Sequence, residues 1–282
     1  MELKDKVIIV TGGAGGIGSA LGRRFVAEGA RVVVLADRDG ARAEEAAAAI
    51  GPAARGTGCD VADDAAVAAL IDEVEGDDGP IDLYCANAGI GAGTGVEAPD
   101  SEWNEVWRVN LMSTVVAARH LVPRWVERGG GYLLVTASAA GLLTSLGDAA
   151  YTATKHAAVG LAEWIWITYG DRGVKVSCLC PQGVRTNMVF GKQAEGHLAT
   201  EQVKKLGVIE PEEVAAAVVE GLADERFLIL PHPQVLEYFR NKAENHGRWL
   251  GGMKKFQRQL TGKGGQAPLS KIPPSAPRSG VD

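Results

Sequence analysis

Three side chains suited to acid–base chemistry lie within one short stretch of the sequence: Ser138, Tyr151 and Lys155. Tyr151 and Lys155 are four residues apart near the start of an apparent helix, so their side chains share one face. An ammonium beside a phenol favours the phenolate and can lower the tyrosine pKa from about 10. Ser138 follows an apparent strand and can present a hydroxyl to the same place. These residues predict proton exchange with a substrate oxygen. The alternative for this stretch alone is an ordinary helix with a solvated lysine.

A glycine-rich segment near the amino terminus indicates a nucleotide site. Residues 6–10 predict a strand, since Lys6 is followed by four apolar residues, and a helical pattern runs from residue 18 to residue 28. Between them lies the run Thr11-Gly12-Gly13-Ala14-Gly15-Gly16-Ile17-Gly18, which fits two overlapping glycine motifs. Between a strand and a helix, such glycines let backbone N–H groups approach a pyrophosphate, and the helix dipole favours the anion there.

The next apparent strand, residues 31–35, leads to a residue that discriminates between cofactors. Asp37 lies 19 residues after Gly18, where an acidic side chain accepts a hydrogen bond from a ribose 2′-hydroxyl and repels a 2′-phosphate. Arg38 favours the opposite choice, because a guanidinium there could bind a phosphate. The sequence therefore predicts NAD as the cofactor, with NADP as the alternative.

Strands and helices alternate along most of the chain, and they must position the candidate acid–base and cofactor-binding residues. Further strands are expected near residue 59 and at residues 80–85, 131–137, 174–180 and 226–230, with helices at 40–50, 64–75, 99–127, 151–169 and 212–222. This alternation predicts an α/β fold with a Rossmann-type doubly wound parallel sheet flanked by helices. In the strand at 174–180, Lys175 and Ser177 are expected to point outward.

The domain organisation is predicted as a single domain with a C-terminal helical extension. Residues 1–230 form the dinucleotide-binding catalytic domain, and residues 187–207 within it are expected to be a mobile lid over the substrate. Residues 231–260 form the extension, where apolar residues recur at helical spacing: Trp249, Leu250, Met253, Phe256 and Leu260. Residues 261–282 are rich in Gly, Pro and Ser and are expected to be a disordered tail.

Composition and charge disfavour nucleic-acid-binding, membrane-spanning and metal-binding classes of protein. The chain has 282 residues, 46% of them hydrophobic, and a formal net charge of −6. Residues 231–282 contribute +6 and residues 1–230 contribute −12, and an acidic body disfavours nucleic acid as a partner. No apolar run resembles a signal peptide or a membrane span, so a cytoplasmic protein is expected. The four cysteines form no CxxC pair, which favours buried thiols and no metal site.

Together these residues resemble the short-chain dehydrogenase/reductase family over residues 4–230. The matching positions are Thr11, Gly12, Gly16, Ile17, Gly18, Asp60, Val61, Asn87, Ala88, Gly89, Asn110, Ser138, Tyr151, Lys155, Pro181 and Thr186. Val184, between the last two, is expected to bind the cofactor as well. The resemblance implies a nicotinamide cofactor and a catalytic set of Asn110, Ser138, Tyr151 and Lys155. In the family's mechanism the tyrosine exchanges a proton with the substrate oxygen, which the serine fixes. The lysine lowers the tyrosine pKa and holds the nicotinamide ribose, and the asparagine supports a water.

One position departs from the family pattern. Gln182 follows Pro181, where the family usually has glycine, and we expect its side chain to border the substrate. The resemblance predicts hydride transfer between NAD(H) and a secondary alcohol or ketone. The apolar stripe of the extension would be costly if it were exposed, so we expect a homo-oligomer, a dimer or a tetramer, with the extension at or near a subunit contact. The alternatives are an NADP(H)-dependent ketone reductase of the same fold and a non-catalytic dinucleotide-binding regulatory protein.

Overall fold

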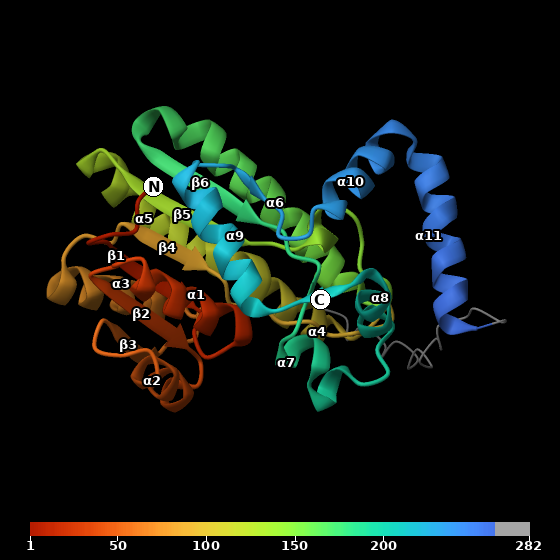
Figure 1. Cartoon of the computed structure of the whole chain (residues 1–282), viewed down its shortest axis with the longest axis horizontal. Helices are drawn as coiled ribbons and strands as arrows, with labels where there is room; N and C mark the ends of the chain where they lie inside the picture. Colours follow the sequence, from red (N-terminus) through yellow and green to blue (C-terminus); the bar gives the residue numbers. More distant parts are fainter. Residues whose placement is uncertain (263–282) are drawn as a thin grey trace, which may run out of the picture.

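The computed structural model describes residues 1–262, and within this range seven parallel strands form one sheet (Figure 1). The strand order is β3-β2-β1-β4-β5-β6-β9. The strands are β1 (Val7–Thr11), β2 (Val32–Asp37), β3 (Ala54–Gly58), β4 (Leu83–Ala86), β5 (Gly131–Thr136), β6 (Val174–Leu179) and β9 (Leu228–Ile229). The order reverses between β1 and β4, which creates a crevice at the carboxyl ends of these strands. The predicted doubly wound α/β fold is confirmed.

Helices cover both faces of the sheet, and each face has its own apolar core. One core joins the sheet to α1 (Gly16–Ala27) and α9 (Pro211–Ala223), through residues such as Phe25 and Val218. The other joins it to α3 (Asp64–Asp78), α5 (Ser113–Arg128) and α6 (Ala149–Tyr169). Alternate residues of β1 enter opposite cores, which explains why the strand is a continuous apolar run. The remaining helix along this edge, α2 (Gly40–Ala48), packs on β2 and β3.

The expectation that Ser177 points to solvent is wrong. Ser177 is fully buried, and its hydroxyl donates to the backbone oxygen of Arg226 at 2.6 Å and lies 2.8 Å from the Tyr132 hydroxyl. Lys175 is exposed, as expected, and pairs with Glu225 at 2.8 Å. Because helices cover both faces of a parallel sheet, an alternating polar residue need not face water.

The long helix predicted at 99–127 contains an irregular turn. It consists of α4 (Asp100–Trp107), a π-helical turn at Arg108–Met112, and α5. Such turns are rare and occur often at functional sites. The turn carries Asn110 at its centre and buries its side chain, which a regular periodicity of apolar residues does not reveal.

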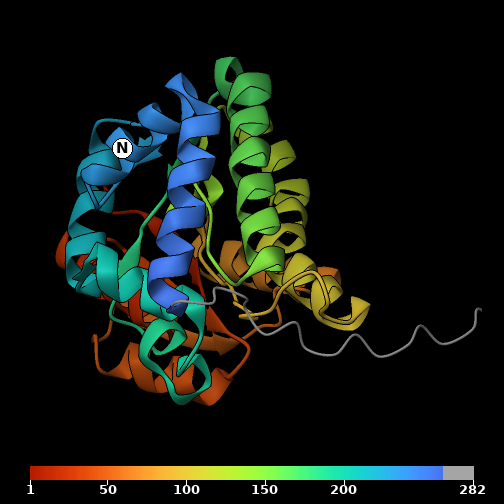
Figure 2. The same ribbon diagram turned by 90° about the vertical axis from the view of Figure 1, so that its right-hand side faces the viewer.

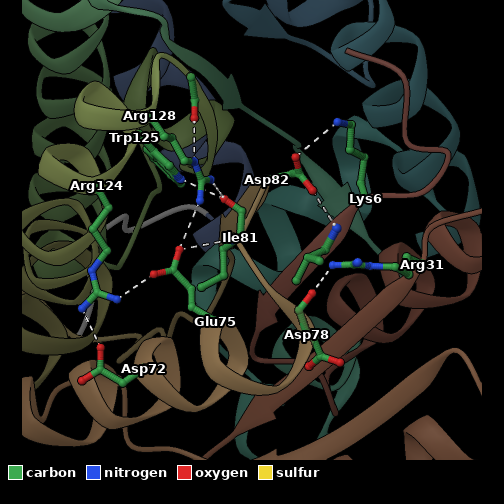
Figure 3. Close-up of polar contacts among 12 residues, drawn as sticks. Lys6, Arg31, Asp72, Glu75, Asp78, Ile81, Asp82, Arg124, Trp125 and Arg128 are labelled. Carbon is green, nitrogen blue, oxygen red and sulfur yellow. Dashed lines mark hydrogen bonds and ion pairs between the residues drawn. The ribbon is translucent and has the colours of Figure 1, made fainter.

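Polar contacts fix the end of the sheet that is opposite the carboxyl ends (Figure 3). Asp82, just before β4, accepts from Nζ of Lys6 at 3.2 Å. Glu75 of α3 accepts from Arg124 and Arg128 of α5, at 2.7 and 3.2 Å. These ion pairs are partly exposed, so each adds little stability. The contacts of Glu75 join α3 to α5, and the Lys6–Asp82 contact joins the residues before β1 and β4.

The segments predicted as a lid and an extension are mostly helical. The lid region holds α7 (Asn187–Phe190) and α8 (Leu198–Leu206), between the short paired strands β7 (Gly183–Val184) and β8 (Val208–Ile209). The extension consists of two helices, α10 (Gln234–Glu244) and α11 (His246–Thr261), and α11 contacts α8 and α10. Figure 2 shows α11 upright at the front of this side of the molecule.

The predicted disordered tail, 261–282, begins at the last residue of α11, and residues 263–282 lie outside the described part of the chain. Among the helices of residues 1–262, none combines the length and the apolar character needed to cross a bilayer.

Candidate active site

A cavity of about 830 Å³ lies at the carboxyl ends of the strands and brings most of the predicted site residues together. Its walls come from the glycine loop, the ends of β2, β4, β5 and β6, the start of α6, and helices α8, α10 and α11. The predicted residues on its wall are Gly12, Gly16, Ile17, Gly18, Asp37, Asn87, Ala88, Gly89, Ser138, Tyr151, Lys155, Pro181, Gln182, Val184 and Thr186. Sites predicted from segments far apart in the sequence therefore share one cavity.

The start of α6 sets the position of Tyr151. Asp148 is the N-cap residue, and its carboxylate accepts from the Tyr151 N–H at 3.1 Å. The other carboxylate oxygen accepts from the N–H groups of Ala92 and Gly93, at 3.0 and 2.9 Å. Asp148 therefore ties the loop after β4 to the first turn of α6. Sequence reasoning missed this residue, although an aspartate three positions before Tyr151 is a recognisable capping signal.

The pKa of Tyr151 is raised to about 12, mainly because the phenol is buried. The hydrogen bond with Ser138 acts in the opposite direction, and the nearby charge of Asp148 raises the pKa further. Nζ of Lys155 lies 5.5 Å from the centre of the tyrosine ring, yet the tyrosine pKa is raised and not lowered as expected, because burial has the largest effect on it. Tyr151 therefore keeps its proton at neutral pH and can donate it to an oxygen in the cavity.

Lys155 is a buried cation beside the cavity. Its side chain is 3% exposed, Nζ donates to the backbone oxygen of Thr136 at 2.9 Å, and it makes no ion pair with any residue in the described range. Burial lowers the pKa of Lys155 to about 8. A lysine with one fixed acceptor and spare donors facing a cavity fits a ligand rich in hydroxyl groups.

Asn110 holds a loop rather than facing the cavity. Its Oδ1 accepts from the N–H of Ile90 at 2.8 Å, and its Nδ2 donates to the oxygen of Ile90 at 2.9 Å. Nδ2 also lies 3.2 Å from the hydroxyl of Thr154, on α6. The asparagine therefore joins the loop after β4 to α6, next to Lys155.

The glycine loop has the shape that an anion site at a helix terminus requires. Gly12 has φ +64°, and a side chain on Gly18 would come within 2.1 Å of the Gly12 oxygen. Thr11 lies behind this turn, where its hydroxyl accepts from the N–H groups of Asn87 and Ala88. The loop opens the cavity at the start of α1, and Asp37 lies beside it. These residues fit the pyrophosphate and the adenosine ribose of a nicotinamide dinucleotide.

Three predicted cofactor residues lie elsewhere in the described chain. Arg38, Asp60 and Val61 lie outside the cavity wall; Arg38 and Asp60 are exposed, and Val61 is buried. Arg42, in the first turn of α2, lines the cavity close to Asp37 instead. Arg42 is therefore a second candidate for a phosphate-binding cation, which the sequence pattern did not single out.

Comparison with known proteins identifies the family. A family model described as short chain dehydrogenase matches residues 6–196. The chain belongs to the short-chain dehydrogenase family. It is therefore an oxidoreductase of alcohol or ketone substrates, with a fold that binds a nicotinamide dinucleotide.

Individual relatives cover much of the chain. It is 38% identical over 203 residues to the sex determination protein tasselseed-2 of Zea mays, which covers 70% of this chain and 60% of that protein. It is 36% identical over 236 residues to the 1-deoxy-11-beta-hydroxypentalenate dehydrogenase of Streptomyces exfoliatus, which covers 81% of this chain and 84% of that protein. A short chain dehydrogenase/reductase from Burkholderia phymatum, solved with NAD, is similar with a TM-score of 0.78 and 28% identity, over 96% of this chain and 99% of that one.

Replacing Lys155 with an apolar side chain should stabilise the folded protein and abolish its activity. Burial lowers its pKa from 10.5 to about 8, so the charged lysine destabilises the folded protein at pH 7 by about 3 kcal/mol. We expect Lys155→Met to remove this cost and raise the free energy of unfolding by about 1–3 kcal/mol in urea titrations, while activity is lost.

The pH dependence of the free energy of unfolding provides a second test of the buried charge of Lys155. The unfolded state binds more protons than the folded state between about pH 8 and the unfolded value near 10.5, so this lysine makes stability rise with pH across that window. The rise attributable to it should be absent in Lys155→Met and present in the exposed control Lys175→Met. A Lys155→Met protein less stable than wild type at pH 7 would contradict the expectation.

Proposed function

We propose that the chain is an NAD(H)-linked dehydrogenase of secondary alcohols, or the ketone reductase that runs the reverse reaction, with Tyr151 as the general acid and base. The observation that carries the proposal is the convergence of Ser138, Tyr151 and Lys155 on the same cavity as the glycine loop and Asp37. A nicotinamide dinucleotide bound there would supply or accept a hydride at the substrate carbon.

The chain's own residues handle the proton. Tyr151 is protonated at neutral pH and can donate to a ketone oxygen while that oxygen gains charge. Ser138 lines the cavity with the tyrosine, and its hydroxyl can hold the same oxygen. The Lys155 ammonium stabilises the phenolate that remains. It is a stronger acid than an ordinary lysine, so it can pass a proton onward.

The substrate end of the cavity favours bulky apolar alcohols. Trp249, Met253 and Phe256 of α11 line the wall together with Leu143 and Leu206. Lys242 of α10 joins the extension to the loop after β5, because its Nζ donates a hydrogen bond to the oxygen of Leu142 at 2.7 Å. The relative from Streptomyces exfoliatus is named as a dehydrogenase of 1-deoxy-11-beta-hydroxypentalenate, which supports an alcohol substrate for the present chain.

NADP(H) is the rival cofactor, and Arg42 is its strongest support. Asp37 favours NAD, because its carboxylate lines the cavity and already accepts from the N–H of Ala14 at 3.1 Å, which fixes it beside the glycine loop. A purely regulatory dinucleotide-binding role would not require Ser138, Tyr151 and Lys155 to converge. The homo-oligomer and the cytoplasmic location stay predictions; an assembly could cover Trp164 and Ile167 of α6, which are 56% and 73% exposed.

Removing the phenolic hydroxyl tests the catalytic assignment. Tyr151→Phe keeps the ring and deletes the proton donor, so kcat should fall by at least about 10²-fold while NADH binding, measured by fluorescence, is largely retained. Tyr132→Phe is the matched control, because Tyr132 is buried in the sheet away from the cavity and should leave kcat unchanged. Near-normal turnover of Tyr151→Phe would refute the assignment.

Asp37 should set the cofactor preference. Wild type should bind NADH more tightly than NADPH by roughly tenfold or more, since 1.4 kcal/mol of repulsion is a factor of ten. Asp37→Ala should reduce this preference, and Arg42→Ala added to it should weaken NADPH again. The control is Asp39→Ala, because Asp39 is exposed and caps α2. Tighter binding of NADPH than of NADH by wild type would overturn the NAD proposal and favour Arg42 as the phosphate ligand.

Substitutions in α11 test the substrate class. Trp249→Ala and Phe256→Ala remove apolar area from the cavity wall and should raise KM for bulky apolar alcohols by about tenfold, with little change in kcat or in KM for small alcohols. Leu250→Ala is the control, since Leu250 lies on the same helix, is 47% exposed and is not part of the wall. Equal effects of all three substitutions would show that α11 acts through stability and not through the substrate.

A further inference from the structure

His232 is a buried histidine outside the cavity wall. It lies between β9 and α10 and is 2% exposed. Its ring contacts the backbone of the 181–183 loop (Pro181, Gln182 and Gly183), which follows β6. Nδ1 lies 3.2 Å from the N–H of Gln182, and Nε2 lies 3.0 Å from the oxygen of Gly183. Both ring nitrogens are therefore used by one loop.

These two contacts determine the form of the ring. A backbone N–H can only donate, so Nδ1 must be unprotonated, and a backbone oxygen can only accept, so Nε2 must carry the hydrogen. The ring is thus neutral. A second proton could only be added to Nδ1, where it would face the Gln182 N–H and break that hydrogen bond. Burial also lowers the pKa of His232 from its ordinary value.

The same loop contacts the catalytic serine on its other side. The oxygen of Pro181 accepts from the N–H of Ala139 at 2.8 Å and from the hydroxyl of Ser138 at 3.4 Å. Pro181 and Gln182 line the cavity at the end where Ser138 and Tyr151 lie. The loop therefore lies between His232 and the reacting end of the cavity, and any movement at Gln182 is transmitted to both the cavity wall and the serine.

The segment that contains His232 also contacts the side chain of Gln182, the residue that replaces the family's usual glycine. Nε2 of Gln234, two residues after His232, donates to Oε1 of Gln182 at 3.3 Å. The side chain of Gln182 is thus drawn toward the first turn of α10. Where the family usually has glycine, this chain has a glutamine whose backbone is held by His232 and whose side chain is held by Gln234.

We propose that His232 is a positioning residue that, in its neutral form, holds the 181–183 loop against the nicotinamide end of the cavity, so that protonation of its ring weakens dinucleotide binding. The inference rests on the proposed function, because it takes the ligand of this cavity to be a nicotinamide dinucleotide. His232 touches neither the cavity nor the reacting atoms, and it acts through the loop backbone.

One acidic side chain near His232 affects the protonation of its ring. Residues 181–183, 228–230 and 233–235 carry no ionisable side chain. Within residues 1–262, Glu213 of α9 is the charged group whose field acts on the ring, and it raises the pKa of His232 against the larger effect of burial. The folded-state pKa therefore stays below the ordinary value of about 6.5. Binding should be complete above pH 7 and should fall as the pH drops below about 6.5.

The test measures NADH binding by fluorescence between pH 8.0 and 5.5 with the full-length protein. Wild type should lose affinity severalfold over this range, and by no more than about tenfold, because a ring whose folded-state pKa lies below about 6.5 is only partly protonated at pH 5.5. In His232→Asn, Oδ1 of asparagine replaces Nδ1 as the acceptor for Gln182 and cannot take up a proton. This variant should bind within about threefold of wild type at pH 8.0 and should lack most of the acid loss.

A second variant separates the two hydrogen bonds. In His232→Gln the side-chain amide replaces Nε2 and still donates to Gly183, but the Gln182 N–H loses its acceptor. NADH binding should be about tenfold weaker at every pH and should again lack the acid loss. His120→Asn is the control, because His120 on α5 pairs with Asp64 far from this loop in the sequence and should keep the wild-type profile.

Thermal unfolding without cofactor gives an independent readout. Because the unfolded state takes up the proton more readily, His232 makes wild-type stability fall as the pH drops below about 6.5, and both variants should show a smaller fall. If wild type binds NADH and both variants show the same acid loss, the inference fails and the proposed function stands. If wild type binds neither NADH nor NADPH at pH 8.0, the proposed function fails and the inference fails with it.

Discussion

The hydrogen bond from Lys155 to the backbone of Thr136 is the contact on which the site depends. It joins α6 to the end of β5 and places a charge in a region where burial lowers the pKa of that lysine. Tyr151 lies one turn earlier on the same face of the helix, and Ser138 lies two residues beyond Thr136. This buried contact and the Asp148 cap of α6 together set the relative positions of the three side chains. The two apolar cores on either side of the sheet provide the stability that an isolated buried charge removes.

The loops around the site are held by polar side chains from elements that are distant in sequence. Asn110 holds Ile90, Asp148 holds Ala92 and Gly93, and His232 holds the 181–183 loop. In each case the side chain bonds to backbone groups, so it fixes the path of the loop whatever side chains the loop carries. Loops built in this way can vary in sequence to suit a substrate while the backbone near the cofactor keeps its position.

The extension after β9 belongs to the cavity. Its first residues contact the 181–183 loop, Lys242 reaches the loop after β5, and the apolar face of α11 lines the wall. An apolar helix face on the surface would be a costly exposed patch. Contact with α8 leaves Trp249, Met253 and Phe256 half-buried beside the cavity, and no residue of α11 is fully buried. Although the formal charges of residues 1–230 and 231–282 are opposite in sign, the contacts named here are hydrogen bonds with backbone groups and apolar contacts.

The sequence by itself determined the fold class, the glycine loop and the set of candidate site residues that share the cavity, because these depend on local patterns. Alternating apolar segments, a strand–glycine–helix junction and a Tyr-to-Lys spacing of four are local properties of the chain. The tertiary structure decided what depends on packing: the buried environment that raises the pKa of Tyr151, the burial of Ser177, and the place of Arg42 rather than Arg38 on the wall. The roles of Asp148 and His232 arise from hydrogen bonds between distant segments, and a sequence pattern cannot specify which distant backbone groups a polar side chain will meet.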